Sequence, residues 1–389
     1  MDVLPNDTAS RIFALLESLD IEAYAVGGYV RDVLMRRTPS DLDIAVSTPP
    51  WETKRRLEPF VRVVDTGMRF GTVTAIIDSV PFELTTFRSD IGIGDGRHPA
   101  NISFVGSITS DLARRDFTVN AMAWSPRNGL IDCFGGRNDI EKRLIRCVGC
   151  PATRFREDAL RIMRALRFAS VLSFSVEDET SKAIFEYAET LPSLSAERIY
   201  SELKKLVCGD NAVHIIKTYK KVLQSAIPRL CAAKINTLDY LPKDDTAARL
   251  ATLFATRDDA ETAMKALKAP RSISSKVLRL HSFSKLPTTA ADIKRLGLDN
   301  DPQLLYEAAV IFENREAAKA IKQIMSQNGF ITAAELDISI EKLLSLGVKN
   351  GPQLGRSLRL LSVAVAEGKC RNHCDELERY LLSHIGEIK

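Results

Sequence analysis

Strand-like hydrophobic patterns are concentrated in the first 150 residues of this 389-residue chain, and this division constrains the fold more than any other feature. Three β-rich runs, at 61–65, 71–77 and 82–87, are predicted to form strands. From Arg156 onward the apolar periodicity is almost wholly helical, with Pro, Gly and Ser breakers between the segments. The chain is therefore predicted to be α+β, with a mixed α/β part followed by an all-α remainder.

Local patterns predict how the N-terminal part is connected. Residues 8–19 are expected to form an amphipathic helix, whose apolar face carries Ile12, Leu15, Leu16 and Leu19. Asp78-Ser79-Val80-Pro81 is expected to form a hairpin turn between the last two strands. Residues 88–111 hold four glycines and a proline, and we expect them to form a mobile loop.

The composition is that of a globular protein, with 45% hydrophobic and 27% charged residues. A chain of this length is expected to contain about two to four domains. No apolar run reaches the roughly 18 residues of a membrane helix, and the N-terminus lacks the pattern of a signal peptide. The seven cysteines follow no regular framework, which indicates a reducing compartment and predicts a cytoplasmic protein without membrane partners.

The net charge of the chain is only +4, so nucleic-acid binding requires locally clustered Lys and Arg. Lys204-Lys205 and Lys217–Lys221 contain such clusters. Solvated helix faces explain these lysines equally well, so charge alone does not identify a partner.

The stretch Tyr24–Val46 combines a glycine pair with two carboxylates. Gly27-Gly28 precedes an expected helix at Val30–Leu34, and the unpaired N–H groups of such a helix start favour phosphate. Asp41 and Asp43 follow in a strand-like run, which would place both carboxylates on one face. Such hard oxygen ligands suit Mg²⁺, which takes part of its shell from substrate phosphates. Together the motifs indicate phosphoryl transfer, whereas each alone is also explained by an ordinary turn or a solvated strand end.

Two further motifs extend this candidate site. Glu83 would complete a three-carboxylate metal site if its strand neighbours the Asp-x-Asp strand, and it is otherwise an exposed strand residue. The adjacent Arg114-Arg115 suits a triphosphate, because guanidinium groups bind phosphate oxygens bidentately. Asp116 and Asn120 are interpreted as a local cap and as ribose partners.

A polar stripe is predicted along one helix, formed by Asp158, Arg161, Arg164 and Arg167. The Watson–Crick edges of cytosine and adenine offer an amino donor beside a ring-nitrogen acceptor, whereas uracil and guanine present the reverse. A carboxylate beside a guanidinium matches the first pattern and mismatches the second, and mismatched buried groups discriminate strongly. Asp158 and Arg161 are therefore a candidate template-free reader of C and A. An exposed salt-bridged helix face is the alternative interpretation.

Eight motifs occur in the order found in bacterial class II tRNA nucleotidyltransferases: GGYVRD, DLDIAV, FELTTFR, DGRHP, RRDFTVNAMAW, GLIDCFGG, RFREDALRIMRALRFAS and AERIYSEL. The chain resembles a CCA-adding enzyme, from a family shared with bacterial poly(A) polymerases. The resemblance covers roughly residues 20–210 strongly and the helical C-terminal half more weakly. One departure is Ser173, which stands where the family usually has glycine.

The resemblance implies roles for individual residues. It implies that Asp41 and Asp43 bind the catalytic Mg²⁺ ions. Glu83 remains the candidate third catalytic carboxylate because of its strand position. The implied nucleotide contacts, from phosphates to base, are Gly28, Arg31, Arg115, Asp116, Asp158, Arg161, Arg164 and Arg167. The stretch 88–111 resembles the flexible loop that switches such enzymes from C to A addition.

The family's fold implies four domains. These are a polymerase-β-like nucleotidyltransferase head at 1–150, a helical neck with base recognition at 151–215, and a helical body and tail at 216–330 and 331–389. The body and tail are expected to bind tRNA, in a monomer or a homodimer.

The implied function is template-independent addition of CCA to the 3′ end of tRNA from CTP and ATP, by two-metal-ion transfer with release of pyrophosphate. The alternatives are a poly(A) polymerase, an enzyme that adds only CC or only A, and an inactive tRNA-binding protein. Intact Asp41, Asp43, Asp158 and Arg161 count against the inactive protein, because binding alone needs no metal site.

Overall fold

The computed structural model describes residues 7–39, 41–91, 101–384 and 386 of the chain. It divides into two compact units, Met1–Ile227 and Pro228–Lys389. The finer division predicted at residues 150, 215 and 330 stays a prediction.

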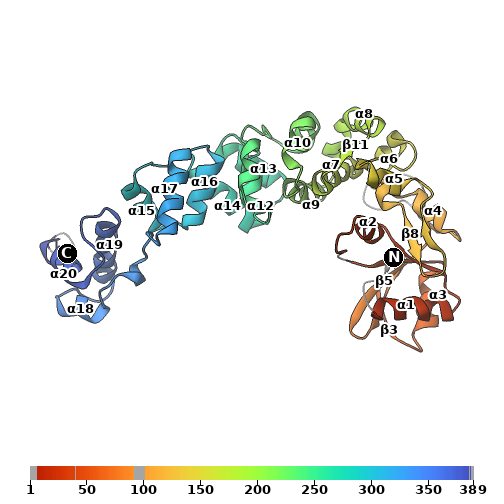
Figure 1. Ribbon diagram of the computed structural model, residues 1–389, viewed down its shortest axis with the longest axis horizontal. Helices are drawn as coiled ribbons and strands as arrows, with labels where there is room; N and C mark the ends of the chain where they lie inside the picture. The colour runs from red at the N-terminus through yellow and green to blue at the C-terminus, as the bar shows by residue number, and fades with distance from the viewer. Residues whose placement is uncertain (1–6, 40, 92–100, 385, 387–389) are drawn as a thin grey trace. The chain divides into compact units, whose positions relative to one another are not determined.

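A mixed sheet lies in the N-terminal part of the first unit (Figure 1). Within the described residues it has seven strands in the order β3-β4-β5-β2-β1-β8-β9. The strand bounds are β1 Ala23–Val26, β2 Asp43–Val46, β3 Arg62–Gly67, β4 Thr72–Ile77, β5 Val80–Thr86, β8 Ala123–Ser125 and β9 Gly129–Ile131. β2 pairs with β5 in parallel, so the predicted strand of Glu83 does neighbour the strand of Asp43.

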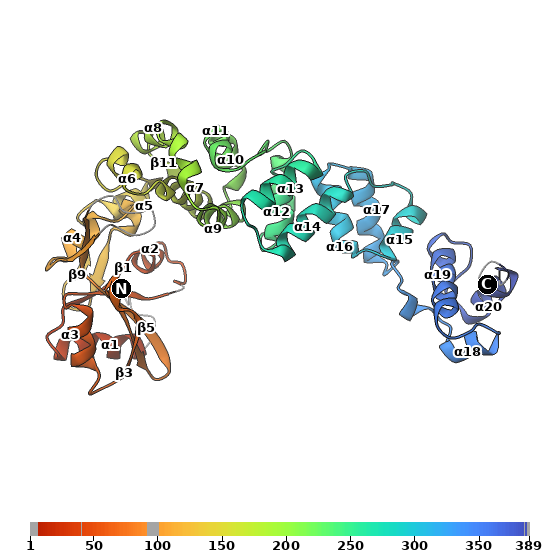
Figure 2. The same cartoon turned by 180° about the vertical axis from the view of Figure 1, so that it is seen from behind.

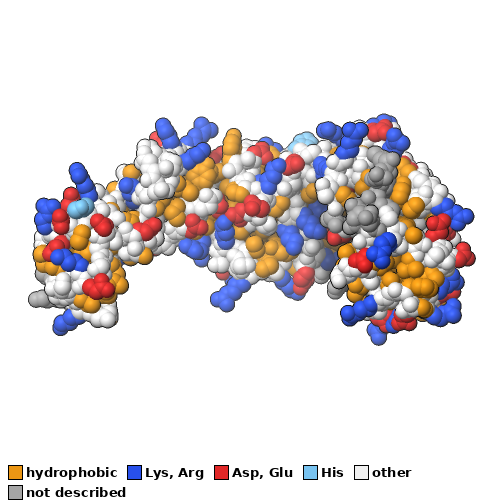
Figure 3. Space-filling view, turned by 60° about the horizontal axis from the view of Figure 1, so that its bottom comes forward, with side chains coloured by type: hydrophobic (Ala, Val, Ile, Leu, Met, Phe, Trp, Pro, Cys, Tyr) orange, Lys and Arg blue, Asp and Glu red, His pale blue; other side chains and the backbone are white. Residues whose placement is uncertain are grey.

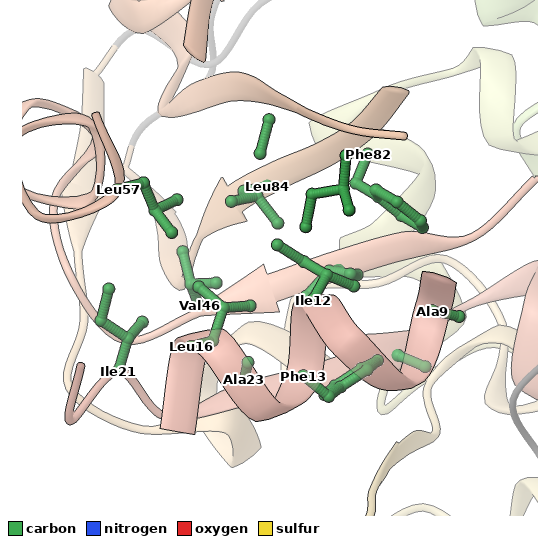
Figure 4. Close-up of a cluster of buried hydrophobic side chains, with 14 of the residues drawn as sticks. Ala9, Ile12, Phe13, Leu16, Ile21, Ala23, Val46, Leu57, Phe82 and Leu84 are labelled. Carbon is green, nitrogen blue, oxygen red and sulfur yellow. The ribbon is translucent and has the colours of Figure 1, made fainter. Parts of the chain in front are cut away.

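The predicted N-terminal helix is confirmed as α1 (Asp7–Ser18). Figure 4 shows Ile12 and Leu16 of α1 directed toward Val46 and Leu84 of the sheet. These side chains are at most 1% exposed, because helical spacing gathers them on one face that packs on the strands. Two further helices, α2 (Gly28–Leu34) and α3 (Pro50–Leu57), complete this part of the unit.

The hairpin between β4 and β5 is tighter than predicted. Ile77 pairs with Val80, so Asp78 and Ser79 alone form the turn, and the expectation that Val80 and Pro81 belong to it is wrong. Both turn residues have positive φ, 49° and 66°. Such turns match the right-handed twist of the flanking strands, which explains the short connection.

The expected loop at 88–111 is wrong at its ends. β6 (Arg88–Ile91) pairs antiparallel with β7 (Asn101–Phe104), and α4 spans Ile108–Ala113. Three of the four glycines and the proline lie between the two strands in sequence, so the residues that led to the prediction are not those that form β6, β7 and α4. The expectation for residues 92–100 lies outside the described residues.

The rest of the first unit is mainly helical, as predicted. Its helices are α5 Gly136–Glu141, α6 Pro151–Glu157, α7 Leu160–Leu172, α8 Asp178–Glu186, α9 Ala196–Val207, α10 Ala212–Thr218 and α11 Lys220–Ala226. Two short strands, β10 (Leu144–Ile145) and β11 (Ser175–Val176), pair in parallel. Only β11 lies beyond residue 150, where strands were expected to fade.

Helices are the regular elements in the described residues of the second unit (Figure 2). They are α12 Thr246–Ala251, α13 Arg257–Ala266, α14 Arg271–Ser282, α15 Ala290–Gly297, α16 Pro302–Ile311, α17 Arg315–Ser326, α18 Ile340–Ser345, α19 Pro352–Ala366 and α20 Cys374–His384. The C-terminal part of the unit has an apolar cluster of its own, centred on Leu343, Leu361 and Leu377.

Charged side chains of both signs are interspersed over the molecular face that Figure 3 displays. This distribution fits the small net charge of +4. No helix in the described ranges is long and apolar enough to cross a membrane.

Candidate functional site

A pocket of about 450 Å³ in the first unit collects most of the predicted site residues. Nine of them line it: Gly28, Arg31, Asp43, Arg115, Asp116, Asp158, Arg161, Arg164 and Arg167. The lining also includes Gly27, Arg114, Asn120 and Phe168. Asp41 and Glu83 are not among the lining residues, although both act electrostatically on Asp43. Segments more than 100 residues apart in sequence therefore meet at one cavity.

Gly27 has a backbone that only glycine adopts readily, with φ 71° and ψ −130°. A Cβ atom added there would lie 2.9 Å from Nη1 of Arg115. The glycine therefore serves two needs, the positive φ before α2 and the close approach of a guanidinium. This geometry places a cation beside the glycine turn that the sequence indicated as a phosphate site.

Arg31 is held rigidly on α2 and is only 8% exposed. Its Nε and Nη2 donate to the two carboxylate oxygens of Asp32, at 2.9 and 3.0 Å. Its Nη1 donates to Oδ1 of Asn120 at 2.7 Å. Asn120 thus orients Arg31, an arrangement that the ribose interpretation of Asn120 missed.

The carboxylates at the end of the sheet concentrate negative charge. Asp43 is the first residue of β2 and lies opposite Glu83 of β5. Asp41 precedes the strand, so the expectation that one strand holds both aspartates is wrong, and the alternation argument does not apply to Asp41. Partial burial, together with the charges of Glu83 and Asp41, raises the pKa of Asp43 above its ordinary value, while Arg115 opposes the shift.

This donor set fits a hard divalent cation, because a cation would relieve the repulsion that raises the pKa of Asp43. Among the described residues, no three Asp, Glu, His or Cys side chains are grouped closely enough to hold a metal ion by themselves. A magnesium ion commonly keeps waters and uses substrate oxygens, so it does not require such a closed group.

Asp111 of α4 clamps the arginine pair. Its Oδ1 accepts hydrogen bonds from Nε and Nη2 of Arg114, and its Oδ2 from Nε and Nη2 of Arg115, at 2.8 to 3.3 Å. Burial opposes ionisation of Asp111, but the charges of Arg115 and Arg114 outweigh it and hold the pKa below its ordinary value. Asp111 was not predicted as a site residue, although its spacing of three and four residues from the two arginines was a usable signal.

Asp116 joins the arginine segment to α7. Its Oδ1 accepts from the backbone N–H of Phe117 at 2.9 Å and from Nδ2 of Asn120 at 3.3 Å. Its Oδ2 accepts from Nε of Arg164 at 2.7 Å. Burial disfavours the charged form of Asp116, yet Arg164 and these hydrogen bonds hold its pKa below the ordinary value. Asp116 is therefore an ion-pair partner in the core of the site.

Asp158 lies between two helices, so the prediction of one continuous helical stripe is wrong at this position. Its backbone is extended, with φ −153° and ψ 107°, where α6 ends and α7 is about to begin. Its Oδ1 accepts from the backbone N–H of Leu160 at 3.0 Å, a local bond that favours such a break. Its Oδ2 accepts from Nη2 of Arg198 at 2.8 Å.

Arg161 faces the same pocket with different partners. Its Nη1 donates to Oε2 of Glu157 at 2.5 Å, and its Nη2 donates to the carbonyl oxygen of Arg114 at 3.1 Å. Asp158 and Arg161 are thus brought to one cavity, each held by a separate neighbour.

Phe168 of α7 is a contact point for three arginines. The guanidinium carbon of Arg167 lies 3.6 Å from the ring centroid, and those of Arg31 and Arg164 lie 5.4 Å from it. Arg167 also forms an ion pair of 2.6 Å with Glu202 of α9. Phe168 was not predicted as a site residue, although an aromatic residue beside an arginine stripe is a recognisable cation–π signal.

Two family descriptions match the first unit. The family described as the poly A polymerase head domain matches residues 23–146, and the family described as a probable RNA- and SrmB-binding site of polymerase A matches residues 173–222. The first match contains the sheet and the carboxylates, and the second contains α9.

Relatives match nearly the full chain. A CCA-adding enzyme of Lactobacillus delbrueckii subsp. bulgaricus is 33% identical, with 96% of both chains covered. One from Streptococcus gordonii is 34% identical, with 98% of both covered. The crystal structure of a Bacillus stearothermophilus CCA-adding enzyme in complex with CTP has a TM-score of 0.76 at 28% identity, covering 98% of this chain and 97% of its own. The chain therefore belongs to the CCA-adding enzyme family of tRNA nucleotidyltransferases.

Proposed function

We propose that the chain adds cytidine, cytidine and adenosine in turn to the 3′ end of tRNA, using CTP and ATP and releasing pyrophosphate. The observation that carries the proposal is the pocket in which residues suited to phosphate and residues suited to a base edge line one cavity. The full-length similarity to CCA-adding enzymes supports the same conclusion. We place the reaction in the cytoplasm, where thiols stay reduced, and no disulfide joins the seven cysteines.

The phosphate half of the proposed site comprises Gly28, Arg31 and Arg115, with Arg164 and Arg167 as further support. Planar guanidinium groups bind phosphate oxygens bidentately, so these arginines would orient the triphosphate. Positioning of this kind converts the encounter of the two reactants into an effectively unimolecular process.

Asp41 and Asp43 are proposed to hold Mg²⁺, with Glu83 as the adjacent third carboxylate. When bound, the ions would supply Lewis-acid activation of the tRNA terminal hydroxyl and neutralise charge on the α-phosphate and the leaving pyrophosphate. Arg115 favours the ionised form of Asp43 that a metal ligand requires, although burial and the neighbouring carboxylates outweigh it and raise the pKa of Asp43.

The base half of the proposed site comprises Asp158 and Arg161. The carboxylate accepts from the amino group that cytosine and adenine share, and the guanidinium donates to their ring nitrogen. Uracil and guanine would place an acceptor against the carboxylate and a donor against the guanidinium, which leaves buried groups unsatisfied. Selection of C and A would therefore need no nucleic-acid template.

The test is incorporation into tRNA that lacks its 3′-terminal CCA, in Mg²⁺ with CTP alone, ATP alone and both. The proposal predicts products that end in C, C, A and stop there. Arrest after CC, addition of A only to a CC end, or long A tails would each overturn it in favour of a CC-adding enzyme, an A-adding enzyme or a poly(A) polymerase. No incorporation would favour a tRNA-binding protein without activity.

The control variant is Asp41→Ala combined with Asp43→Ala. Transfer should fall to background, because the proposed metal ligands are gone. The affinity for tRNA should change by less than about twofold, since these carboxylates contribute no phosphate contact. A parallel loss of affinity and transfer would contradict the assigned roles.

A further inference from the structure

Helix α9 packs on α7 (Figure 1). Arg198 and Glu202 of α9 pair with residues on the α7 side of this interface. Arg198 and Glu202 are four residues apart, so their side chains lie on the same helix face. Both pair across the helix interface with residues of the proposed nucleotide site. Arg198 donates to Asp158 at 2.8 Å, and Glu202 forms the 2.6 Å ion pair with Arg167. These residues belong to the AERIYSEL motif, to which no role has yet been assigned.

Arg198 leaves room for a base on Asp158. A carboxylate offers about four lone-pair sites. Two protein donors use it here, Leu160 N–H on Oδ1 and Arg198 on Oδ2. The remaining sites can accept the amino group of cytosine or adenine while Arg198 stays bound. Arg198 therefore supports the carboxylate without competing with the base.

Removal of Arg198 would change both the charge environment and the orientation of Asp158. The side chains of the pair are 19% and 27% exposed, so water replaces the guanidinium only in part. The neutral N–H of Leu160, which donates to the other carboxylate oxygen, would remain in place. A charge-assisted bond is roughly twice as strong as a neutral one, so the orientation of the carboxylate would be less well defined.

Glu202 acts on Arg167 in a comparable way. Burial lowers the pKa of Arg167, and the charge of Glu202 counteracts this shift. The ion pair also holds the Arg167 guanidinium against the ring of Phe168, at 3.6 Å from its centroid. Arg31 and Arg164 approach the same ring, so the position of Arg167 is part of the cationic wall of the pocket.

We propose that Arg198 and Glu202 are positioning residues for nucleotide selection, with Arg198 orienting the base-reading Asp158 and Glu202 orienting Arg167. The proposal rests on the proposed function, because it needs Asp158 to read the base. The two residues act on different halves of the nucleotide, so they have different kinetic signatures. Arg198 determines the preference for C over U, and Glu202 determines the affinity for any nucleoside triphosphate.

The test of Arg198 compares kcat/KM for CTP and UTP on tRNA lacking CCA. Arg198→Ala should lower kcat/KM for CTP by about 10- to 100-fold, as expected for loss of a hydrogen bond to a charged group. The value for UTP should change much less, so the CTP-to-UTP ratio falls. Arg198→Lys should give an intermediate ratio, because an ammonium group keeps the charge and one donor toward Asp158. Glu197→Gln, an exposed change at the adjacent position, should leave the ratio unchanged.

A double-variant cycle shows whether Arg198 acts through Asp158. Asp158→Ala combined with Arg198→Ala should discriminate no worse than Asp158→Ala alone, because residues that act as a unit are not additive. Additive losses, or an unchanged ratio in Arg198→Ala, would overturn the proposal. If Asp158→Ala itself keeps the ratio, the base-reading role in the proposed function fails as well. If Asp158→Ala lowers the ratio and Arg198→Ala does not, only the positioning role fails.

Glu202→Gln tests the second half of the proposal. The change keeps the shape of the side chain and removes its charge, so KM for CTP and for ATP should both rise by about 10-fold. The CTP-to-UTP ratio should stay at the wild-type value. The contrary result is a fall in kcat with an unchanged KM, where the fall matches the loss of folded protein in a thermal unfolding scan. That result would show a purely structural role and overturn the proposal.

Discussion

Asp43 and Glu83 lie opposite each other on the parallel strands β2 and β5. This parallel pair joins the strand that begins at Asp43 with a strand that lies some 40 residues later in the sequence. Their carboxylates raise the local negative charge at one end of the sheet, and this charge is the electrostatic basis of the proposed cation site.

Asp43→Asn should separate catalysis from stability. Transfer should fall by more than about a hundredfold, because a metal ligand supplies several kcal/mol of transition-state stabilisation. A raised carboxyl pKa in the folded state means that the ionised group destabilises the fold as pH rises through that pKa. The variant should therefore be at least as stable as the wild type at pH 7 without divalent cations, by thermal unfolding. Asp20→Asn, an exposed change outside the pocket, is the control for both measurements. A marked loss of stability in Asp43→Asn would contradict the repulsion argument.

Gly27→Ala should weaken nucleotide binding as well as stability. The positive φ of 71° costs about 1 to 3 kcal/mol for a residue with a Cβ atom. The added Cβ would also displace Arg115, whose Nη1 lies 2.9 Å away, so KM for CTP should rise. Gly129→Ala has a φ of 67° and open space around the added Cβ, so it isolates the backbone cost. Equal KM values in the two variants would show that the approach of Arg115 is unimportant.

Asp116→Asn should destabilise the first unit by about 3 kcal/mol at pH 7, because Arg164 loses its buried counter-charge. The pKa of Asp116 is lowered in the folded state, so its stabilising effect is present above the ordinary pKa of about 4 and is lost as pH falls through the folded value. Urea unfolding of wild type and variant should show a difference that narrows below about pH 4. A difference that stays constant down to pH 2 would contradict the assigned ion pair.

His281 should make the second unit sensitive to mild acid. Its Nε2 donates to the carbonyl oxygen of Ala251 at 3.2 Å, and burial, reinforced by Lys234, lowers its pKa to about 4. The neutral form is favoured in the folded state, so stability is full above the ordinary pKa of about 6.5 and falls as pH drops toward the folded value. This linkage should cost about 2 to 3 kcal/mol between pH 7 and pH 4. His281→Gln should remove that part of the pH dependence in urea unfolding, and an unchanged profile would refute the linkage.

Short-range patterns predicted the elements of the fold well. Ile12 and Leu16 recur at helical spacing, and they are buried against the sheet as expected. The strand runs around Thr72–Ile77 and Val80–Thr86 were also recognisable, because a strand needs only local alternation and β-branched residues. The predicted turn between them was two residues longer than the observed turn. The pairing register depends on backbone twist as well as on composition.

The partners of the site residues were not accessible from the sequence. Asp158 was expected on one helix with Arg161, but a local bond to Leu160 N–H and the distant Arg198 determine its position. Asp111 contacts neighbours in sequence and could have been found, whereas the pairing of Asp116 with Arg164 spans 48 residues. Such long-range pairs depend on which helices pack together, and no spacing rule encodes that choice.

Ser173 is a departure that the backbone makes informative. It follows α7 with φ 58°, the left-handed conformation in which helices commonly end on glycine. Glycine, which the resemblance implies at this position, adopts such a φ without strain, and serine adopts it at a modest energetic cost. Serine therefore raises the conformational energy of this helix terminus, while the helix still ends at the same position.

The cluster of Arg31, Arg164 and Arg167 around Phe168 has a consequence for binding entropy. Three long side chains are already confined by Asp32, Asp116 and Glu202 before any nucleotide arrives. Ordering a side chain of this length at an interface costs about 0.5 to 1.5 kcal/mol. This conformational entropy is lost when the chain folds and not when the nucleotide binds. The pocket is therefore preorganised, and a larger part of the interaction energy with a triphosphate contributes to the binding affinity.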